Sequence, residues 1–171
     1  NWLNMERIHL GPNDDRVRSN LFGDLDVKLP TSARRGDSFW ATKVVTRARK
    51  KDAYGLIQAF AYRAFRRDLA AIDLEQFNSV FDSAVEEGEP FVHALRAAYR
   101  AILCSARFIY LQESPGELDG YALATRLSYF LWSSTPDEQL LRLAKEGKLD
   151  QDKVLRQEVR RMLRAERGQE F

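Results

Sequence analysis

Residues 123–141 read LATRLSYFLWSSTPDEQLL, and this run predicts two helices joined by a sharp corner. The apolar residues of its first part recur at the spacing of a buried helix face. These residues are Leu123, Leu127, Phe130 and Leu131. The serines at positions 133 and 134 interrupt the pattern, so we expect the first helix to end there.

The tetrapeptide at residues 135–138, Thr-Pro-Asp-Glu, restarts the helix. We expect Thr135 to cap it, because a threonine hydroxyl accepts hydrogen bonds from the free N–H groups of a first turn. Pro136 suits the first helical position, and Glu138 completes a capping box with Thr135. These residues predict architecture rather than a reaction.

The same signals recur along the chain from residue 52 onward. Asp73 and Asp119 precede apolar stripes as expected caps, and Gly88 and Gly147 follow two of them. Helices are expected near residues 53–67, 73–87, 90–104, 120–132, 136–146 and 152–165. Their core is expected to contain Phe60, Phe65, Phe77, Phe81, Leu95, Ile102, Leu127 and Leu131. The sequence therefore predicts a mainly α fold, a helical bundle of about six short helices.

Residues 1–50 differ from the rest of the chain. Residues 11–15, Gly-Pro-Asn-Asp-Asp, are a strong turn signal, and many turn formers follow. We expect the end of a preceding β domain and an irregular connection. Residues 42–46 fit either a strand or the beginning of a helix.

The composition is that of a folded domain with balanced charge. Of the 171 residues, 44% are hydrophobic and 11% aromatic, which is enough for a real core. The 27 basic and 25 acidic side chains leave a net charge of +2, which argues against a strong field for nucleic acid or membrane surfaces. No apolar run approaches the roughly 20 residues of a transmembrane segment. The chain begins with Asn1, and we expect a piece of a longer protein.

The cysteine and histidine content predicts no catalytic, cofactor or metal site in this chain. Covalent haem attachment requires Cys-x-x-Cys-His, whereas Cys104 is followed by Ser-Ala-Arg. Because Cys104 ends an apolar helix, we expect a small buried hydrophobe. His9 and His93 are far apart in the sequence, and a zinc site needs three or four ligands.

The arginines form the one ambiguous pattern. Arg63, Arg66 and Arg67 could form a phosphate-binding face together with Arg96, Arg100 and Arg107. A second cluster consists of Arg160, Arg161, Arg164 and Arg167. Acidic residues interleave elsewhere, and cations near helix C-termini also complement the helix dipole. We therefore expect no nucleic-acid binding.

Arg126 and Trp132 are further candidates for a structural or partner contact, beside Thr135 and Glu138. Arg126 lies at the edge of an apolar stripe, where an arginine often pairs with a carboxylate or with exposed carbonyls. Trp132 and the aromatic residues before it could stack on a sugar or a haem edge. Their helical spacing favours core packing.

Three stretches resemble known families: residues 61–67 (AYRAFRR), 101–108 (AILCSARF) and 123–141. Together they resemble the large exported multidomain proteins abundant in planctomycetes. In these proteins, domains of unknown function 1595 and 1592 often accompany a cytochrome c domain. The family usually has proline where this chain has Asp68 and Ala106, so the turns at these two corners are expected to differ.

The resemblance implies a division of the chain. Residues 1–50 would be the end of a preceding β domain plus a linker. Residues 52–115 would form a helical module resembling family 1595, and residues 119–171 the start of a module resembling family 1592. It also implies export to the periplasm or outside the cell, with haem elsewhere in the larger polypeptide.

We therefore expect a non-catalytic structural or interaction module. Its partners would be neighbouring domains of the same polypeptide, with polysaccharide as a further candidate. Two alternatives stay open. The chain could be part of an enzyme acting on extracellular polysaccharide or another polymer, with catalytic residues partly outside it. The third alternative is a nucleic-acid-binding module.

Overall fold

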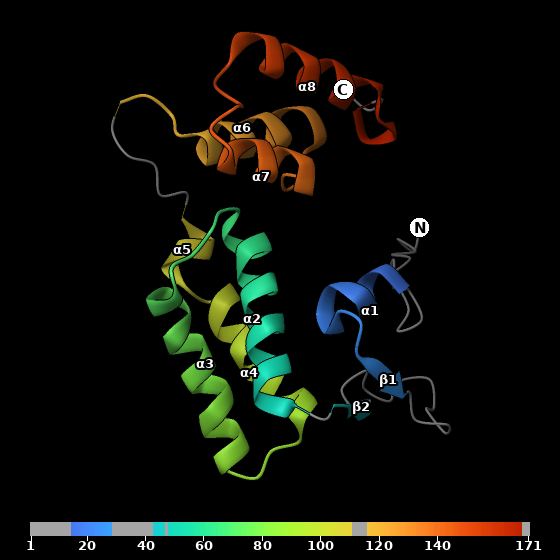
Figure 1. The fold of residues 1–171 in the computed structure, drawn as a ribbon, viewed down its shortest axis with the longest axis vertical. Coiled ribbons are helices and arrows are strands. Elements are labelled where there is room, and N and C mark those ends of the chain that lie inside the picture. Colours follow the sequence, from blue (N-terminus) through green and yellow to red (C-terminus); the bar gives the residue numbers. More distant parts are fainter. Residues whose placement is uncertain (1–14, 29–42, 47, 111–115, 169–171) are drawn as a thin grey trace, which may run out of the picture. The chain divides into compact units, whose positions relative to one another are not determined.

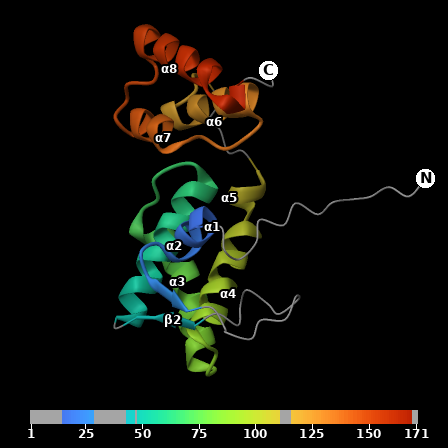
Figure 2. The ribbon, with the colours of Figure 1, turned by 90° about the vertical axis from the view of Figure 1, so that its right-hand side faces the viewer.

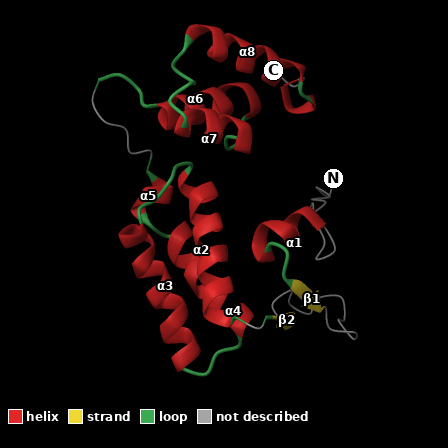
Figure 3. Cartoon of the chain, in the orientation of Figure 1, coloured by secondary structure: helices red, strands yellow, loops and turns green. Residues whose placement is uncertain are grey.

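The computed structural model describes residues 15–28, 43–46, 48–110 and 116–168, and these residues are mainly helical. Figures 1 and 3 show the elements in chain order. The helices are α1 (Asp15–Phe22), α2 (Arg49–Phe65), α3 (Ala71–Glu86), α4 (Phe91–Leu103), α5 (Ala106–Ile109), α6 (Gly120–Trp132), α7 (Glu138–Lys145), α8 (Asp152–Arg164) and the short 3-10 helix η2 (Glu166–Gly168). The six predicted helices are confirmed as α2, α3, α4, α6, α7 and α8.

Two short strands precede the long helices. Strand β1 (Asp26–Lys28) pairs antiparallel with β2 (Lys43–Val45), and Val27 lies opposite Val44. The ambiguity over residues 42–46 is therefore resolved in favour of a strand at 43–45. The turn expected at residues 11–15 lies almost wholly outside the described residues.

The chain divides into two compact units. Unit 1 contains residues 1–60 and 77–99, and unit 2 contains residues 61–76 and 100–171. Each long helix from α2 to α4 contributes one part to each unit, because the division falls within all three helices.

Unit 1 is held together by aromatic contacts. The rings of Phe60 and Tyr99 stack with centroids 4.1 Å apart, and Phe81 meets Phe91 edge to face at 5.7 Å. Figures 1 and 2 show α2, α3 and α4 side by side. The residues before α2 join this core, since Phe22 is fully buried.

A hydrogen bond also anchors the segment before α2. The Tyr99 hydroxyl donates to the carbonyl of Leu21 over 2.7 Å. This end of α1 thus packs on the helices, although the sequence suggested only an irregular connection here.

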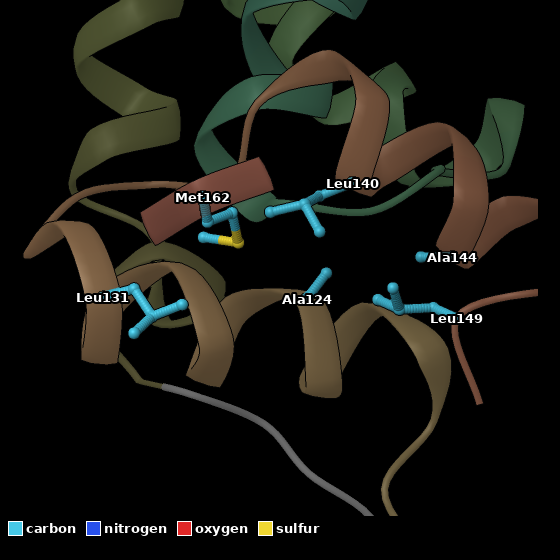
Figure 4. Close-up of a cluster of buried hydrophobic side chains, with 6 residues drawn as sticks. All are labelled: Ala124, Leu131, Leu140, Ala144, Leu149 and Met162. Atoms are coloured by element: carbon cyan, nitrogen blue, oxygen red, sulfur yellow. The ribbon is translucent and has the colours of Figure 1, made fainter. Parts of the chain in front are cut away.

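Unit 2 contains a second core, formed by α6, α7, α8 and the connection between α7 and α8. Figure 4 shows side chains from these elements directed toward one another. The buried members are Ala124, Leu131, Leu140, Ala144, Leu149 and Met162. Leu127 and Trp132 are partly buried and pack against this cluster.

Six of the eight predicted core residues are buried. They are Phe65, Phe77, Phe81, Leu95, Ile102 and Leu131, each at most 5% exposed. Phe60 and Leu127 are half-buried. The prediction for Cys104 was wrong: it is exposed, because α4 ends at Leu103 and Cys104 begins the turn that follows.

The structure corrects the capping prediction at the corner after α6. Ser133 adopts a left-handed conformation (φ 49°) and ends the helix, as expected. The next helix, however, is capped by Asp137, whose carboxylate accepts the backbone N–H of Leu140 at 2.9 Å. Thr135 is exposed, and Glu138 is the first helical residue. Aspartate is a better N-cap than threonine, and the carboxylate of Asp137 also binds Arg161 of α8.

The other two predicted caps had different outcomes. Asp119 caps α6 as predicted, with its carboxylate accepting the N–H of Ala122 at 2.7 Å. Asp73 lies inside the first turn of α3 instead of before it, and its carboxylate binds Arg107. A cap whose donor lies in the same segment can be predicted from the sequence. A partner from another helix, such as Arg107 for the carboxylate of Asp73, cannot.

We predict that Asp137→Ala lowers the free energy of unfolding by about 0.5–2 kcal/mol, because α7 loses its cap. Asp137→Asn keeps a capping oxygen and should lose only the contribution of the ion pair, so its effect should be smaller. Chemical denaturation of both variants measures the difference.

Thr135→Ala is the control for this prediction. It should change stability by less than about 0.5 kcal/mol, since the side chain is exposed and caps nothing. A loss for Thr135→Ala as large as that for Asp137→Ala would contradict the assignment of the cap.

Candidate functional site

A pocket of about 260 Å³ lies within unit 2. The end of α2, the connection to α3, the first turn of α3, the region of α5 and the first turns of α6 form its wall. The lining residues are Phe65, Arg66, Arg67, Asp68, Leu69, Asp73, Arg107, Tyr110, Tyr121, Ala122 and Thr125. Three arginines and three hydroxyl groups therefore border one small cavity.

Arg66 is the most unusual of these residues. It is buried, with 7% of its surface exposed, and it adopts a left-handed backbone conformation (φ 59°) directly after α2. Its guanidinium donates to the hydroxyl of Tyr129 over 3.3 Å and lies 6.0 Å from the centre of that ring. Among the described residues, none forms an ion pair with Arg66.

The other charges around the pocket are paired with one another. Arg107 binds Asp73 at 2.6 Å, and Arg67 binds Asp119 at 3.0 Å. The hydrogen bond from Arg107 outweighs burial and lowers the pKa of Asp73. Three elements, α3, α5 and α6, are thereby tied to the rim of the pocket.

Asp68 joins two further elements. It accepts the hydroxyl of Tyr121 at 3.2 Å from α6 and binds Lys145 of α7 at 2.8 Å. The hydrogen bond to Asp68 raises the pKa of Lys145. Burial, followed by the charge of Asp68, raises the pKa of Tyr121. Asp68 thus links the end of α2 to both α6 and α7 through polar contacts.

This arrangement favours binding an anion over performing acid–base catalysis. A general acid needs a raised pKa, whereas Arg107 lowers that of Asp73. Within the described ranges, no three side chains of His, Cys, Asp or Glu gather as a metal site would require.

The structure brings together part of the predicted arginine face. Arg66, Arg67 and Arg107 line the pocket, whereas Arg63 is half-buried on α2 outside the lining. Arg100 is exposed on α4, and Arg96 belongs to unit 1. Only tertiary structure could bring these arginines together, because Arg107 comes from α5 whereas Arg66 and Arg67 follow α2.

The second arginine cluster lies on α8. Arg160, Arg161 and Arg164 border a depression there, and the side chain of Arg167 lies outside the described part of the chain. Arg161 is already engaged within the fold. It donates to both carboxylate oxygens of Asp137, at 2.8 and 3.2 Å, and to Glu158 at 2.8 Å.

The remaining candidates lie on the helices of unit 2. Trp132 donates its indole N–H to the carbonyl of Met162 at 3.0 Å, and the guanidinium of Arg161 lies 5.5 Å from the indole centre. This geometry supports the packing interpretation of Trp132. Arg126 and Glu138 are exposed, on α6 and at the start of α7.

Sequence reasoning did not find the contacts of Glu158, which is 6% exposed. Its carboxylate accepts from Gln139 at 2.6 Å and from Arg161. The available signal was a glutamate among the apolar positions of α8, which the helical pattern alone does not distinguish from a surface charge.

Comparison with known families finds a match for each of two parts of the helical region. Residues 118–171 match the family model PSD4, a protein of unknown function (DUF1592). Residues 52–113 match PSD5, a protein of unknown function (DUF1595). Each match covers about a third of the chain, and the similarity is that of the matched residues. No curated protein and no solved structure matches the chain.

These matches confirm the resemblance to the two families of unknown function. Both matched regions contribute to the pocket: Arg66, Arg67 and Arg107 lie in the residues that match DUF1595, and Tyr121 and Thr125 lie in those that match DUF1592. No described helix is long and apolar enough to cross a membrane.

We predict that Trp132→Phe lowers stability by about 0.5–1.5 kcal/mol, because the carbonyl of Met162 loses its donor. Trp132→Ala should cost about 3 kcal/mol, near the low end for tryptophan because the ring is only partly buried. Urea denaturation measures both values. An unchanged midpoint for Trp132→Ala would contradict the packing role.

We predict that the stabilising effect of Asp73 is lost in acid. The folded pKa is lowered, so the pairing with Arg107 is fully present above about pH 5 and is lost as pH falls through the folded pKa. Wild type should be more stable than Asp73→Asn at pH 7, and the difference should vanish near about pH 2.

Asp152→Asn provides the control, because Asp152 forms an exposed pair with Arg156 within α8. Its stability difference from wild type should be small at every pH. A difference for Asp73→Asn that is independent of pH would show that Arg107 does not stabilise the carboxylate.

Proposed function

We propose that the chain is a non-catalytic helical module that positions neighbouring domains of a larger exported polypeptide. The observation that supports this most directly is the use of charged groups within unit 2. Arg161 joins α7 to α8, and Asp68 joins the end of α2 to both α6 and α7. Side chains that could carry chemistry are used to hold helices in register.

The family resemblance suggests which domains would flank the module. In such a polypeptide they would be a cytochrome c domain and a β domain of carbohydrate-binding type. The end of α1 is fixed to the helices, because Phe22 is buried and the carbonyl of Leu21 accepts from Tyr99. A segment held in this way supports a fixed orientation of a preceding domain better than a flexible linker would.

The competing proposal, an enzyme acting on polysaccharide, has less support from the geometry. Glycosidases need two carboxylates, one with a raised pKa. The two carboxylates of the pocket, Asp68 and Asp73, are both bound to cations, and the pKa of Asp73 is lowered.

The test uses the larger polypeptide with Leu140→Ala, which should destabilise unit 2 by about 2–5 kcal/mol because Leu140 is fully buried. Small-angle scattering should show a broader distribution of distances between the flanking domains, while each flanking domain keeps its own activity. Ile72→Ala is the matched control, because Ile72 is 73% exposed on α3.

Two results would overturn the proposal. One is an unchanged distance distribution in Leu140→Ala when circular dichroism shows that unit 2 has loosened. The other is hydrolysis of a polysaccharide by the wild-type polypeptide that Asp68→Asn or Asp73→Asn abolishes, which would establish the enzyme instead.

A further inference from the structure

Within the described part of the chain, one positive charge of the pocket in unit 2 has no carboxylate partner. The charged residues of the lining and their ion-pair partners include four cations, which are Arg66, Arg67, Arg107 and Lys145. Three carboxylates pair with them, those of Asp68, Asp73 and Asp119. Each carboxylate is bound to Arg67, Arg107 or Lys145, so among the described residues the charge without a carboxylate is that of Arg66.

Burial makes this charge significant. A guanidinium has five N–H donors, and Tyr129 accepts from one of them. A buried charge without a counter-ion is unfavourable, because the low-dielectric surroundings replace water poorly. An anion entering the pocket would supply both the missing charge and acceptors for the remaining donors.

The backbone at Arg66 is a second, independent observation. A residue in the left-handed region commonly ends a helix, and this residue is usually glycine because a Cβ atom is sterically disfavoured there. Here an arginine occupies that conformation (φ 59°). Helix termination alone would favour glycine, so the left-handed position does not itself require the guanidinium.

The rest of the lining limits the ligand. A volume of about 260 Å³ is below the range of most drug-sized pockets, so the ligand is small. Phe65, Tyr110 and Tyr121 supply aromatic faces beside the charge, and Ala122 leaves space on the side of α6. These surfaces suit an apolar or ring-shaped body attached to the anionic group.

We propose that this pocket binds a small organic ligand through one carboxylate or phosphate group, with Arg66 as the residue that pairs with it. The proposal goes beyond a positioning role for the module. Both family segments contribute to the lining, so a bound ligand would also stabilise the join between them.

The test measures binding of benzoate and inorganic phosphate to the full chain by isothermal titration calorimetry and NMR titration in buffer with physiological chloride. Benzoate supplies a carboxylate on a ring, and phosphate supplies the other oxyanion. Binding of either one supports the proposal and identifies the group. Failure of both to bind at millimolar concentration overturns it.

Arg66→Gly is the decisive variant. Because glycine fits the left-handed position, the variant should fold with a thermal midpoint close to that of wild type, whereas affinity should fall by about tenfold or more. Arg156→Ala, which removes an exposed arginine of α8, should bind like wild type. Unchanged affinity in Arg66→Gly overturns the proposal.

A second variant keeps the proposal testable if Arg66→Gly does not fold. Ala122→Leu leaves every charge in place and fills the pocket from α6. Affinity for the probe should fall with the chain still folded, and retained affinity would show that the anion binds elsewhere. A loss of positioning in the larger polypeptide is a separate readout, so the two proposals fail independently.

Discussion

The carboxylate of Asp137 binds two helices at once, and the placement of α8 against α7 depends on it. One of its oxygens accepts the N–H of Leu140, which fixes where α7 begins. The same carboxylate receives two donors from Arg161, which fixes α8 against that point. A shift of either helix along its axis would break the two hydrogen bonds from Arg161.

The apolar core of unit 2 lies beside this junction and benefits from it. Leu140 and Met162 are fully buried, one from each of the joined helices. Hydrophobic burial supplies most of the stabilisation but specifies position poorly, because it is not directional. The ion pair and the indole hydrogen bond of Trp132 to Met162 add the directional component.

Arg66 illustrates the opposite situation. Arg161 gains a raised pKa because hydrogen bonds to Asp137 and Glu158 outweigh the effect of burial, so its charge is satisfied within the fold. Arg66 is more buried than Arg161, yet a tyrosine hydroxyl is the partner that the structure provides. Arg161 thus holds two helices together, whereas Arg66 is the residue that we propose pairs with a ligand.

The mainly α fold, its six helices, most of the core and the resemblance to both families could be predicted from the sequence. These features follow from local information: apolar spacing, the stops at Ser133 and Gly147, and the cap at Asp119. The tertiary structure was needed to show that Asp137 and not Thr135 caps α7, that Asp73 binds Arg107, and that Arg66, Arg67 and Arg107 share a pocket. Asp137 binds Arg161, 24 residues away in the chain, and Asp73 binds Arg107, 34 residues away, and a local sequence pattern does not specify partners at such a distance.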